Sequence, residues 1–273
     1  MTGDRRRSQS ANTAATTGSA ALGRSRALMH DAGYSAAIVI AAVGAYLVLS
    51  AVVLGVIDDP IIATLAVDGL VIATVLGLRA LRPQWLSYTP PAQPSGFWPW
   101  ALPAFCLAFL AGQSAALGLY ELVGSAGFDA AADTREASNP ILVLTLTLVA
   151  APVCEEAMMR GLLYPLLRRR VSVLVSALIS ATVFAAMHAN MVQAAATIPM
   201  ALLLAMVYER TRTLWPVMVL HAVFNLAAML VPLAVIAALS TPVMTVLLLA
   251  AYILALARVF ARIQAGPQGG PCL

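Results

Sequence analysis

In the segment Ala151-Pro-Val-Cys-Glu-Glu-Ala-Met-Met-Arg-Gly161, two adjacent carboxylates and one guanidinium stand in the middle of a long apolar run. A charged side chain at bilayer depth costs at least about 2.5–3.5 kcal/mol on insertion scales. Glu156 and Arg160 are four residues apart with the acid first, the favourable order for an ion pair on one helix face. Glu155 points about 100° away around the helix. We therefore predict that Arg160 neutralises Glu156, and that Glu155 is either a functional group or a protonated structural one.

The composition is that of a membrane protein. Of the 273 residues, 61% are hydrophobic and 10% are charged, whereas soluble domains average about 45–50% apolar and 25% charged residues. This excludes an ordinary soluble domain and predicts an all-α, polytopic bundle of membrane helices that has the lipid bilayer as a partner. The net charge of +4 comes from arginines between the apolar runs, so no nucleic-acid partner is expected.

Eight apolar runs are long enough, or nearly so, to cross about 30 Å of hydrocarbon. With a cytoplasmic N-terminus, fourteen of the sixteen arginines fall on the cytoplasmic side, Arg135 falls outside and Arg160 lies in the membrane. This satisfies the positive-inside rule. We therefore predict about eight transmembrane helices with both termini cytoplasmic, in a multi-pass protein of the cell membrane. The acidic, Gly- and Ala-rich stretch Glu121–Asn139 is expected to be a loop. The runs are Tyr34–Val56, Ile61–Leu78, Trp100–Tyr120, Ile141–Leu167, Val171–Met187, Met191–Tyr208, Leu214–Leu233 and Pro242–Ala257.

The composition divides the chain into four parts. Residues 1–30 are rich in Ser, Thr and Ala and carry five arginines, which predicts a disordered cytoplasmic tail. Residues 31–140 hold the N-terminal spans, with an interfacial segment near 79–99 that is rich in proline and aromatic residues. Residues 141–230 form a membrane core that contains most of the polar intramembrane groups. Residues 231–273 hold the last span and a second cytoplasmic tail.

Two of the three histidines lie inside apolar runs. His188 ends the fifth run and shares a helix face with Phe184, while His221 shares a face with Asn225 in the seventh run. A single membrane histidine is more often an interhelical hydrogen-bonding group than a catalyst. Together with Glu155, however, these residues concentrate polar side chains in the second half of the chain. Ionisable groups inside a membrane indicate a functional site by default.

The sequence resembles a known family. Three short patterns follow one another on successive membrane regions, and they are similar to the three motifs of the CAAX protease and bacteriocin-processing family of intramembrane proteases. This family includes the CAAX prenyl endopeptidases and the bacterial abortive-infection proteins. The resemblance covers about residues 141–230. The patterns are Glu155-Glu156-x-x-x-Arg160, Phe184-x-x-x-His188 and His221-x-x-x-Asn225.

The resemblance implies an intramembrane endopeptidase that acts on a membrane-associated peptide or protein. Hydrolysis of a peptide bond needs an activated water, a base and donors for the tetrahedral oxyanion. A carboxylate and a histidine can activate the water, and a second histidine and an amide can bind the oxyanion. The catalytic candidates are Glu155, His188, His221 and Asn225, and the supporting candidates are Glu156, Arg160 and Phe184.

The sequence leaves two questions open. Members of the family are commonly described as metalloproteases, and Glu155, His188 and His221 would give zinc three ligands and an open fourth position. If Glu155 bound a metal, however, Glu156 would have to be the base, and its pairing with Arg160 argues against that role. The cofactor therefore stays unknown, and zinc is one possibility. The alternative function is a proton-coupled transporter or a non-catalytic immunity or scaffold protein. A proton relay has no need of oxyanion donors, which favours hydrolysis.

Overall fold

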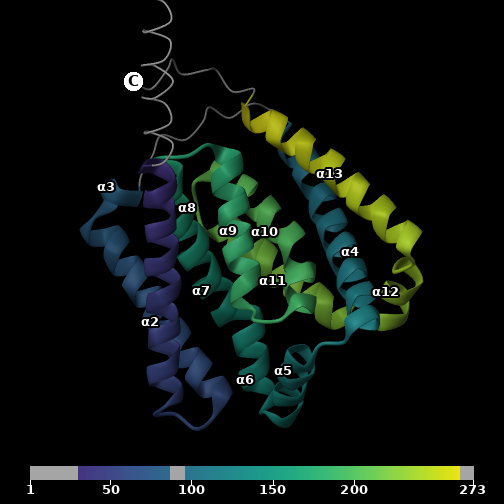
Figure 1. The fold of residues 1–273 in the computed structure, drawn as a ribbon, viewed down its shortest axis with the longest axis horizontal. Coiled ribbons are helices and arrows are strands. Elements are labelled where there is room, and N and C mark those ends of the chain that lie inside the picture. The colour runs from purple at the N-terminus through teal and green to yellow at the C-terminus, as the bar shows by residue number, and fades with distance from the viewer. Residues whose placement is uncertain (1–29, 87–95, 265–273) are drawn as a thin grey trace, which may run out of the picture.

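The computed structural model describes residues 30–86 and 96–264, and every regular element in these two ranges is a helix (Figure 1). The predicted all-α bundle is therefore confirmed. The predicted tails at residues 1–29 and 265–273, and residues 87–95 of the interfacial segment, lie outside the described ranges. The helices are His30–Leu54, α2 (Pro60–Leu81), α3 (Pro83–Leu86), α4 (Trp98–Val123), α5 (Ala126–Ala137), α6 (Pro140–Thr145), the π-helix η1 (Leu146–Ala150), α7 (Ala151–Met158), the π-helix η2 (Met159–Leu163), α8 (Tyr164–Arg168), α9 (Val173–Met187), α10 (Met191–Thr211), α11 (Trp215–Leu230), α12 (Leu233–Leu239) and α13 (Pro242–Gln264).

Each of the eight predicted apolar runs falls on a helix, but two of these helices are short for a membrane span. By length and composition, six helices in the described ranges can cross a membrane, and α11 with α12 makes a seventh if that pair, bent by 97°, is one span. α9 has 15 residues, about 22 Å of helix, against a hydrocarbon core of about 30 Å. The chain is thus a multi-pass membrane protein with six or seven candidate spans. An eighth span and the cytoplasmic position of both termini stay predictions.

The acidic stretch that was expected to be a loop forms the helix α5, so that prediction was wrong. The Ser125 hydroxyl caps this helix by accepting a hydrogen bond from the Phe128 N–H at 3.2 Å. Asp129 stands in the first turn, where the helix dipole favours an acid. Alanine, the strongest helix former, is the commonest residue of α5, and its high content outweighs the single glycine. None of the α5 side chains is buried.

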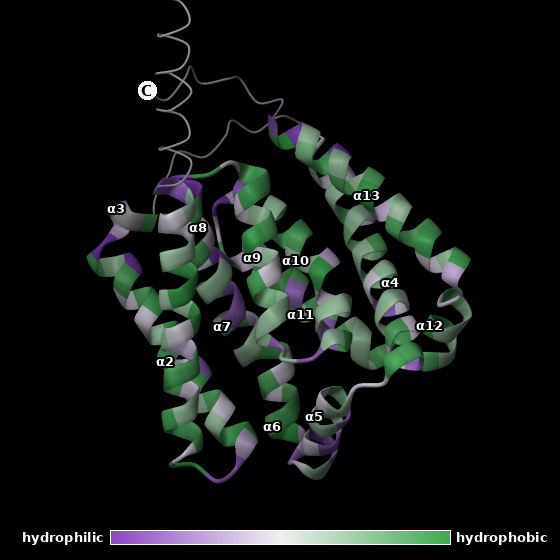
Figure 2. Ribbon diagram, in the orientation of Figure 1, coloured by the Kyte–Doolittle hydropathy of each residue, from purple (hydrophilic) through white to green (hydrophobic). Residues whose placement is uncertain are grey.

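α10 is the most buried of the spanning helices and lies between α4, α9 and α11. Small residues allow α4 to approach it closely: a Cβ at Gly112 would clash with the Ala196 carbonyl group. On the far side of α4 lies α13 (Figure 1), whose Tyr252 hydroxyl donates to the Pro199 carbonyl of α10 at 2.6 Å. The outer faces of the bundle are mostly hydrophobic (Figure 2), as lipid contact requires.

The helical segment from Pro140 to Arg168 carries the central charged residues without interruption. Each of its π-helices lies just before a proline, Pro152 or Pro165. A proline in a helix offers no N–H to the carbonyl four residues earlier and crowds that carbonyl. A π-helical turn accommodates this defect without ending the helix. The Gly161 carbonyl, four residues before Pro165, accepts a hydrogen bond from the Arg79 guanidinium of α2 at 3.1 Å instead.

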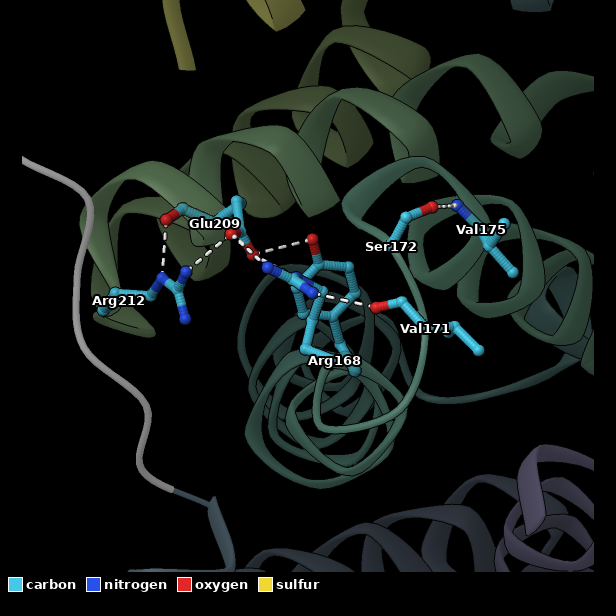
Figure 3. Close-up of polar contacts among 7 residues, drawn as sticks. Arg168, Val171, Ser172, Val175, Glu209 and Arg212 are labelled. Atoms are coloured by element: carbon cyan, nitrogen blue, oxygen red, sulfur yellow. Dashed lines mark hydrogen bonds and ion pairs between the residues drawn. The ribbon is translucent and has the colours of Figure 1, made fainter. Parts of the chain in front are cut away.

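A buried carboxylate near the end of α10 ties α8 to α10. Glu209 is only 3% exposed, and Figure 3 shows it between Arg168 and Arg212. Its oxygens lie 3.1 and 3.2 Å from Arg168 Nε and Nη2 and 2.6 Å from Arg212 Nη2. The Tyr164 hydroxyl donates to the same carboxylate at 2.9 Å. Arg168 also donates to the Val171 carbonyl at 2.9 Å, which fixes the start of the connection to α9.

We expect Glu209→Ala to lower the free energy of unfolding by about 3–5 kcal/mol, the cost of breaking a buried ion pair by removing one partner. The substitution deprives Arg168, Arg212 and the Tyr164 hydroxyl of a shared acceptor. The midpoint of denaturant unfolding in detergent measures the loss. Glu136→Ala in the exposed helix α5 is the matched control and should leave the midpoint unchanged. Equal midpoints for both variants would contradict a stabilising role of Glu209.

Candidate active site

The ion pair predicted from the spacing of Glu156 and Arg160 is present and fully buried. Arg160 Nη1 lies 3.0 Å from Glu156 Oε1, and both side chains are 0% exposed. Arg160 Nη2 donates to the Ala201 carbonyl of α10. The pair therefore links α7 and η2 to the centre of the bundle, and Figure 2 shows hydrophilic positions at α7 within the mostly hydrophobic helices.

His221 of α11 lies between the two glutamates of α7. Its Nδ1 atom is 2.9 Å from Glu156 Oε1, and its Nε2 atom is 3.4 Å from Glu155 Oε2. The imidazole is 2% exposed, so it faces the protein interior and not the lipid. Glu155 has no partner within its own helix segment, as the sequence indicated. Its partner His221 comes from a helix more than sixty residues away in the chain.

The position of His221 determines where protons lie in this cluster. A carboxylate accepts hydrogen bonds only, so Nδ1 donates to Glu156. The contact between Nε2 and Glu155 is then attractive only when a proton lies between them, either on Nε2 or on the carboxyl group. In the first case two carboxylates face one guanidinium and one imidazolium, and the cluster is neutral, as its burial requires. A proton between Glu155 and His221 therefore leaves the cluster neutral, whichever of the two groups carries it.

Glu155 and His188 line one cavity of about 70 Å³. The Glu155 side chain is 30% exposed, whereas that of Glu156 is 0% exposed. Since a site needs about 10–15 Å³ of such space to hold one water molecule, the cavity is large enough for water. Neither His221 nor Asn225 lines it. Its walls are Tyr46, Cys154, Glu155, Met158, Met159, Phe184, Met187 and His188.

His188 is held in one tautomer by its own helix. Its Nδ1 atom lies 3.0 Å from the Phe184 carbonyl oxygen, which can only accept, so Nδ1 carries the proton. In the neutral ring Nε2 is then an acceptor. The backbone turns sharply after His188, with Ala189 at a φ of 56°. The Asn190 amide, which caps α10, donates to the His188 carbonyl at 3.0 Å.

Phe184 packs against three of the polar candidates. Its ring centre lies 5.0 Å from that of His188 and 5.7 Å from that of His221, both in edge-on geometry. The Arg160 guanidinium lies 5.7 Å from the same ring centre, within the range of a cation–π contact. Phe184 is 1% exposed. It therefore fixes the orientation of both imidazoles and excludes water from the Arg160 side.

The Asn225 amide donates to the Thr147 carbonyl of η1 at 2.9 Å. Within η1 the backbone bonds run over five residues, since the Ala151 N–H donates to the Leu146 carbonyl. The next bond of this kind would run from residue 152 to Thr147, but Pro152 has no N–H. Asn225 satisfies the carbonyl that this proline leaves without a donor, and one amide N–H of Asn225 remains for another acceptor.

The three candidate zinc ligands, Glu155, His188 and His221, do not meet at one point. In residues 30–86 and 96–264, no three His, Cys, Asp or Glu side chains are arranged so that they could hold one metal ion. His188 Nδ1 is bonded to its own backbone, and His221 does not line the cavity shared by Glu155 and His188. The three candidates therefore do not fit a zinc site in this arrangement, and no step below is routed through a metal.

Two residues near the cavity were not among the site candidates predicted from the sequence, although Asp68 was visible there as a lone intramembrane acid with an expected structural role. Tyr46 of the helix His30–Leu54 lines the cavity beside Glu155, although no motif marks it. Asp68 of α2 is 3% exposed and shares a hydrogen bond with the Cys154 thiol. A buried acid of α2 therefore contacts Cys154, the residue that directly precedes the glutamate pair. The packing of the first two helices against α7 brings both residues close to the site, and this packing could not be predicted from the sequence.

The fold and the site define a class: a polytopic helical membrane protein with a buried Glu–His–Arg cluster beside a small internal cavity. Residues 137–227 match the family model described as type II CAAX prenyl endopeptidase Rce1-like. This range covers about a third of the chain and contains all seven candidate residues. Comparison with curated proteins and with solved structures gives no match.

Proposed function

We propose that this protein is an intramembrane endopeptidase of the CAAX type, in which Glu155 and His188 activate the attacking water. The observation that supports this best is their position on one cavity large enough for water, with His221 Nε2 3.4 Å from Glu155 Oε2. The family match supports the reaction class. We place the protein in the cell membrane, and its substrate is a membrane-associated peptide or protein.

In the proposed reaction, a water molecule lies in the cavity between Glu155 and His188. Glu155, or His188 through Nε2, takes one proton from this water while the water oxygen bonds to the carbonyl carbon of the scissile peptide. The carbonyl π electrons move to its oxygen and form a tetrahedral oxyanion. The proton then passes to the amide nitrogen, the C–N bond breaks, and a carboxylic acid and an amine leave.

His221 and Asn225, on the same face of α11, are the proposed donors for the oxyanion. Asn225 has one amide N–H left, and His221 would offer the Nε2–H that faces Glu155 in the resting site. The buried pair of Glu156 and Arg160 acts one step further from the reaction. Glu156 accepts from His221 Nδ1 at 2.9 Å, which directs Nε2 towards Glu155. Arg160 compensates the charge of Glu156 and anchors it to α10.

Hydrolysis in oxygen-18 water tests the reaction class. The purified full-length chain in proteoliposomes, given a membrane-anchored reporter peptide, should yield two fragments, and the new carboxyl terminus should carry one oxygen-18 atom. Intact peptide after prolonged incubation, over a panel of reporters with different sequences, would count against an endopeptidase. A transporter or a scaffold protein would then be the better explanation of the buried cluster.

We expect His188→Ala to reduce the cleavage rate by about 10²-fold or more, the usual contribution of one acid–base group. The hydrogen bond that the His188 ring makes within the described residues is to its own helical turn, so the fold is expected to survive the substitution. His30→Ala is the matched control, since the His30 side chain is 68% exposed, and it should keep the wild-type rate. A wild-type rate for His188→Ala would remove this residue from the mechanism.

A further inference from the structure

A second and larger cavity lies between the helix His30–Leu54 and the start of α9. Its volume is about 740 Å³, ten times that of the catalytic cavity. We call it the Arg170 groove. Its lining residues are Asp31, Ala32, Ser35, Ala36, Val39 and Ile40 on the first helix, and Arg170, Val171, Ser172, Val175 and Ile179 at the start of α9.

The body of the Arg170 groove suits a hydrocarbon chain. Small side chains at Ala32, Ser35 and Ala36 leave the space between the two helices unfilled. Below them the walls are apolar, and Ile40 and Val175 are 70% and 42% exposed, so the groove opens sideways. In a bilayer an open apolar groove of this kind faces lipid.

One end of the groove carries two opposite charges. Arg170 Nη1 lies 3.9 Å from Asp31 Oδ1, and the side chains are 44% and 30% exposed. A charge-assisted hydrogen bond measures about 2.7–2.9 Å, so the two groups attract each other without a close hydrogen bond. The Arg170 guanidinium also lies 4.9 Å from the centre of the Tyr34 ring, which holds it at this end. A ligand with both a negative and a positive group can bind between them.

We propose that the Arg170 groove binds one phosphatidylethanolamine molecule. Its phosphate pairs with Arg170, its ammonium donates to Asp31, and one acyl chain lies along the groove between Ala36, Val39 and Val175. The other common phospholipids satisfy only part of this site. Phosphatidylglycerol has no cation for Asp31, and the trimethylammonium group of phosphatidylcholine has no N–H to donate. Arg169 and Arg170 directly follow α8, and arginines at the end of a membrane helix are expected at the level of the lipid headgroups.

The test measures lipid binding and is independent of proteolysis. Dioleoyl phosphatidylethanolamine, phosphatidylcholine and phosphatidylglycerol are titrated into the full-length chain in detergent, and bound lipid is counted by native mass spectrometry. We expect one tight phosphatidylethanolamine molecule, bound about tenfold or more tightly than phosphatidylcholine, the effect of one hydrogen bond between charged groups. Equal binding of the three lipids, or a preference for phosphatidylglycerol, would overturn the proposal.

Three variants locate the site. Asp31→Asn should abolish the preference for phosphatidylethanolamine over phosphatidylcholine, because it removes only the acceptor charge at an exposed position. Ala36→Trp should fill the groove and weaken binding of the tight lipid. Leu47→Trp is the steric control, since Leu47 lies on the same helix, is 58% exposed and does not line the groove. If Asp31→Asn keeps the full preference, the headgroup binds elsewhere and the assignment is wrong. A second copy of the chain in the groove would give dimers in place of the lipid adduct, and the assignment would again be wrong.

Discussion

Glu155→Gln is expected to reduce the rate of peptide cleavage by about 10²–10⁴-fold, the range for loss of a general base, while the protein keeps its fold. Glutamine has the shape of glutamate but cannot take a proton from water. Its amide oxygen can still face His221 Nε2, so the contact at 3.4 Å is kept in geometry. The initial rate on a reporter peptide in proteoliposomes and the unfolding midpoint in detergent measure the two parts of this prediction.

The control for this experiment is a glutamate of the same chemistry outside the cavity. Glu121 lies near the end of α4 and is exposed, so Glu121→Gln should cleave at the wild-type rate. If Glu155→Gln unfolds as wild type and also cleaves as wild type, Glu155 is not the base, and the water must be activated by another group. If Glu155→Gln fails to fold, the contact between Glu155 and His221 is structural, and the site assignment fails for a different reason.

The parts of the fold that depend on one helix could be predicted from the sequence. The pair of Glu156 and Arg160 follows from the helix repeat alone, because residues four apart meet on one face. The apolar runs could be predicted as helices because about twenty consecutive apolar residues match the length of helix needed to cross a bilayer. Even the position of the π-helices has a local cause in Pro152 and Pro165.

The parts that depend on packing between distant helices could not be predicted. His221 and Asn225 share a helix face, as expected, but their partners lie on α7 and η1. Which carboxylate oxygen His221 meets depends on how α11 crosses α7, and no spacing within one segment carries this information. Tyr46 is a clearer case, since it reaches the cavity from a helix about a hundred residues before the motifs.

Arg160→Met is expected to lower the free energy of unfolding by about 3–5 kcal/mol, because it leaves the Glu156 carboxylate buried without its cation. Methionine retains much of the apolar stem of arginine, so packing changes little and the lost charge dominates. The side chain is 0% exposed, and Glu156 Oε2 already has no hydrogen-bond partner among the described residues. The Ala201 carbonyl also loses a donor. Denaturant unfolding in detergent measures the change.

The double variant Arg160→Met with Glu156→Gln separates the charge from the packing. Neutral glutamine still offers an oxygen to His221 Nδ1, so the buried negative charge is gone while that hydrogen bond can remain. Removing both members of a buried ion pair costs much less than removing one, and the double variant should therefore be more stable than Arg160→Met alone. If both variants are equally unstable, the cost lies in lost packing or in the Ala201 contact. If Arg160→Met unfolds as wild type but no longer cleaves the reporter, Arg160 acts in the reaction and not as the structural partner of Glu156.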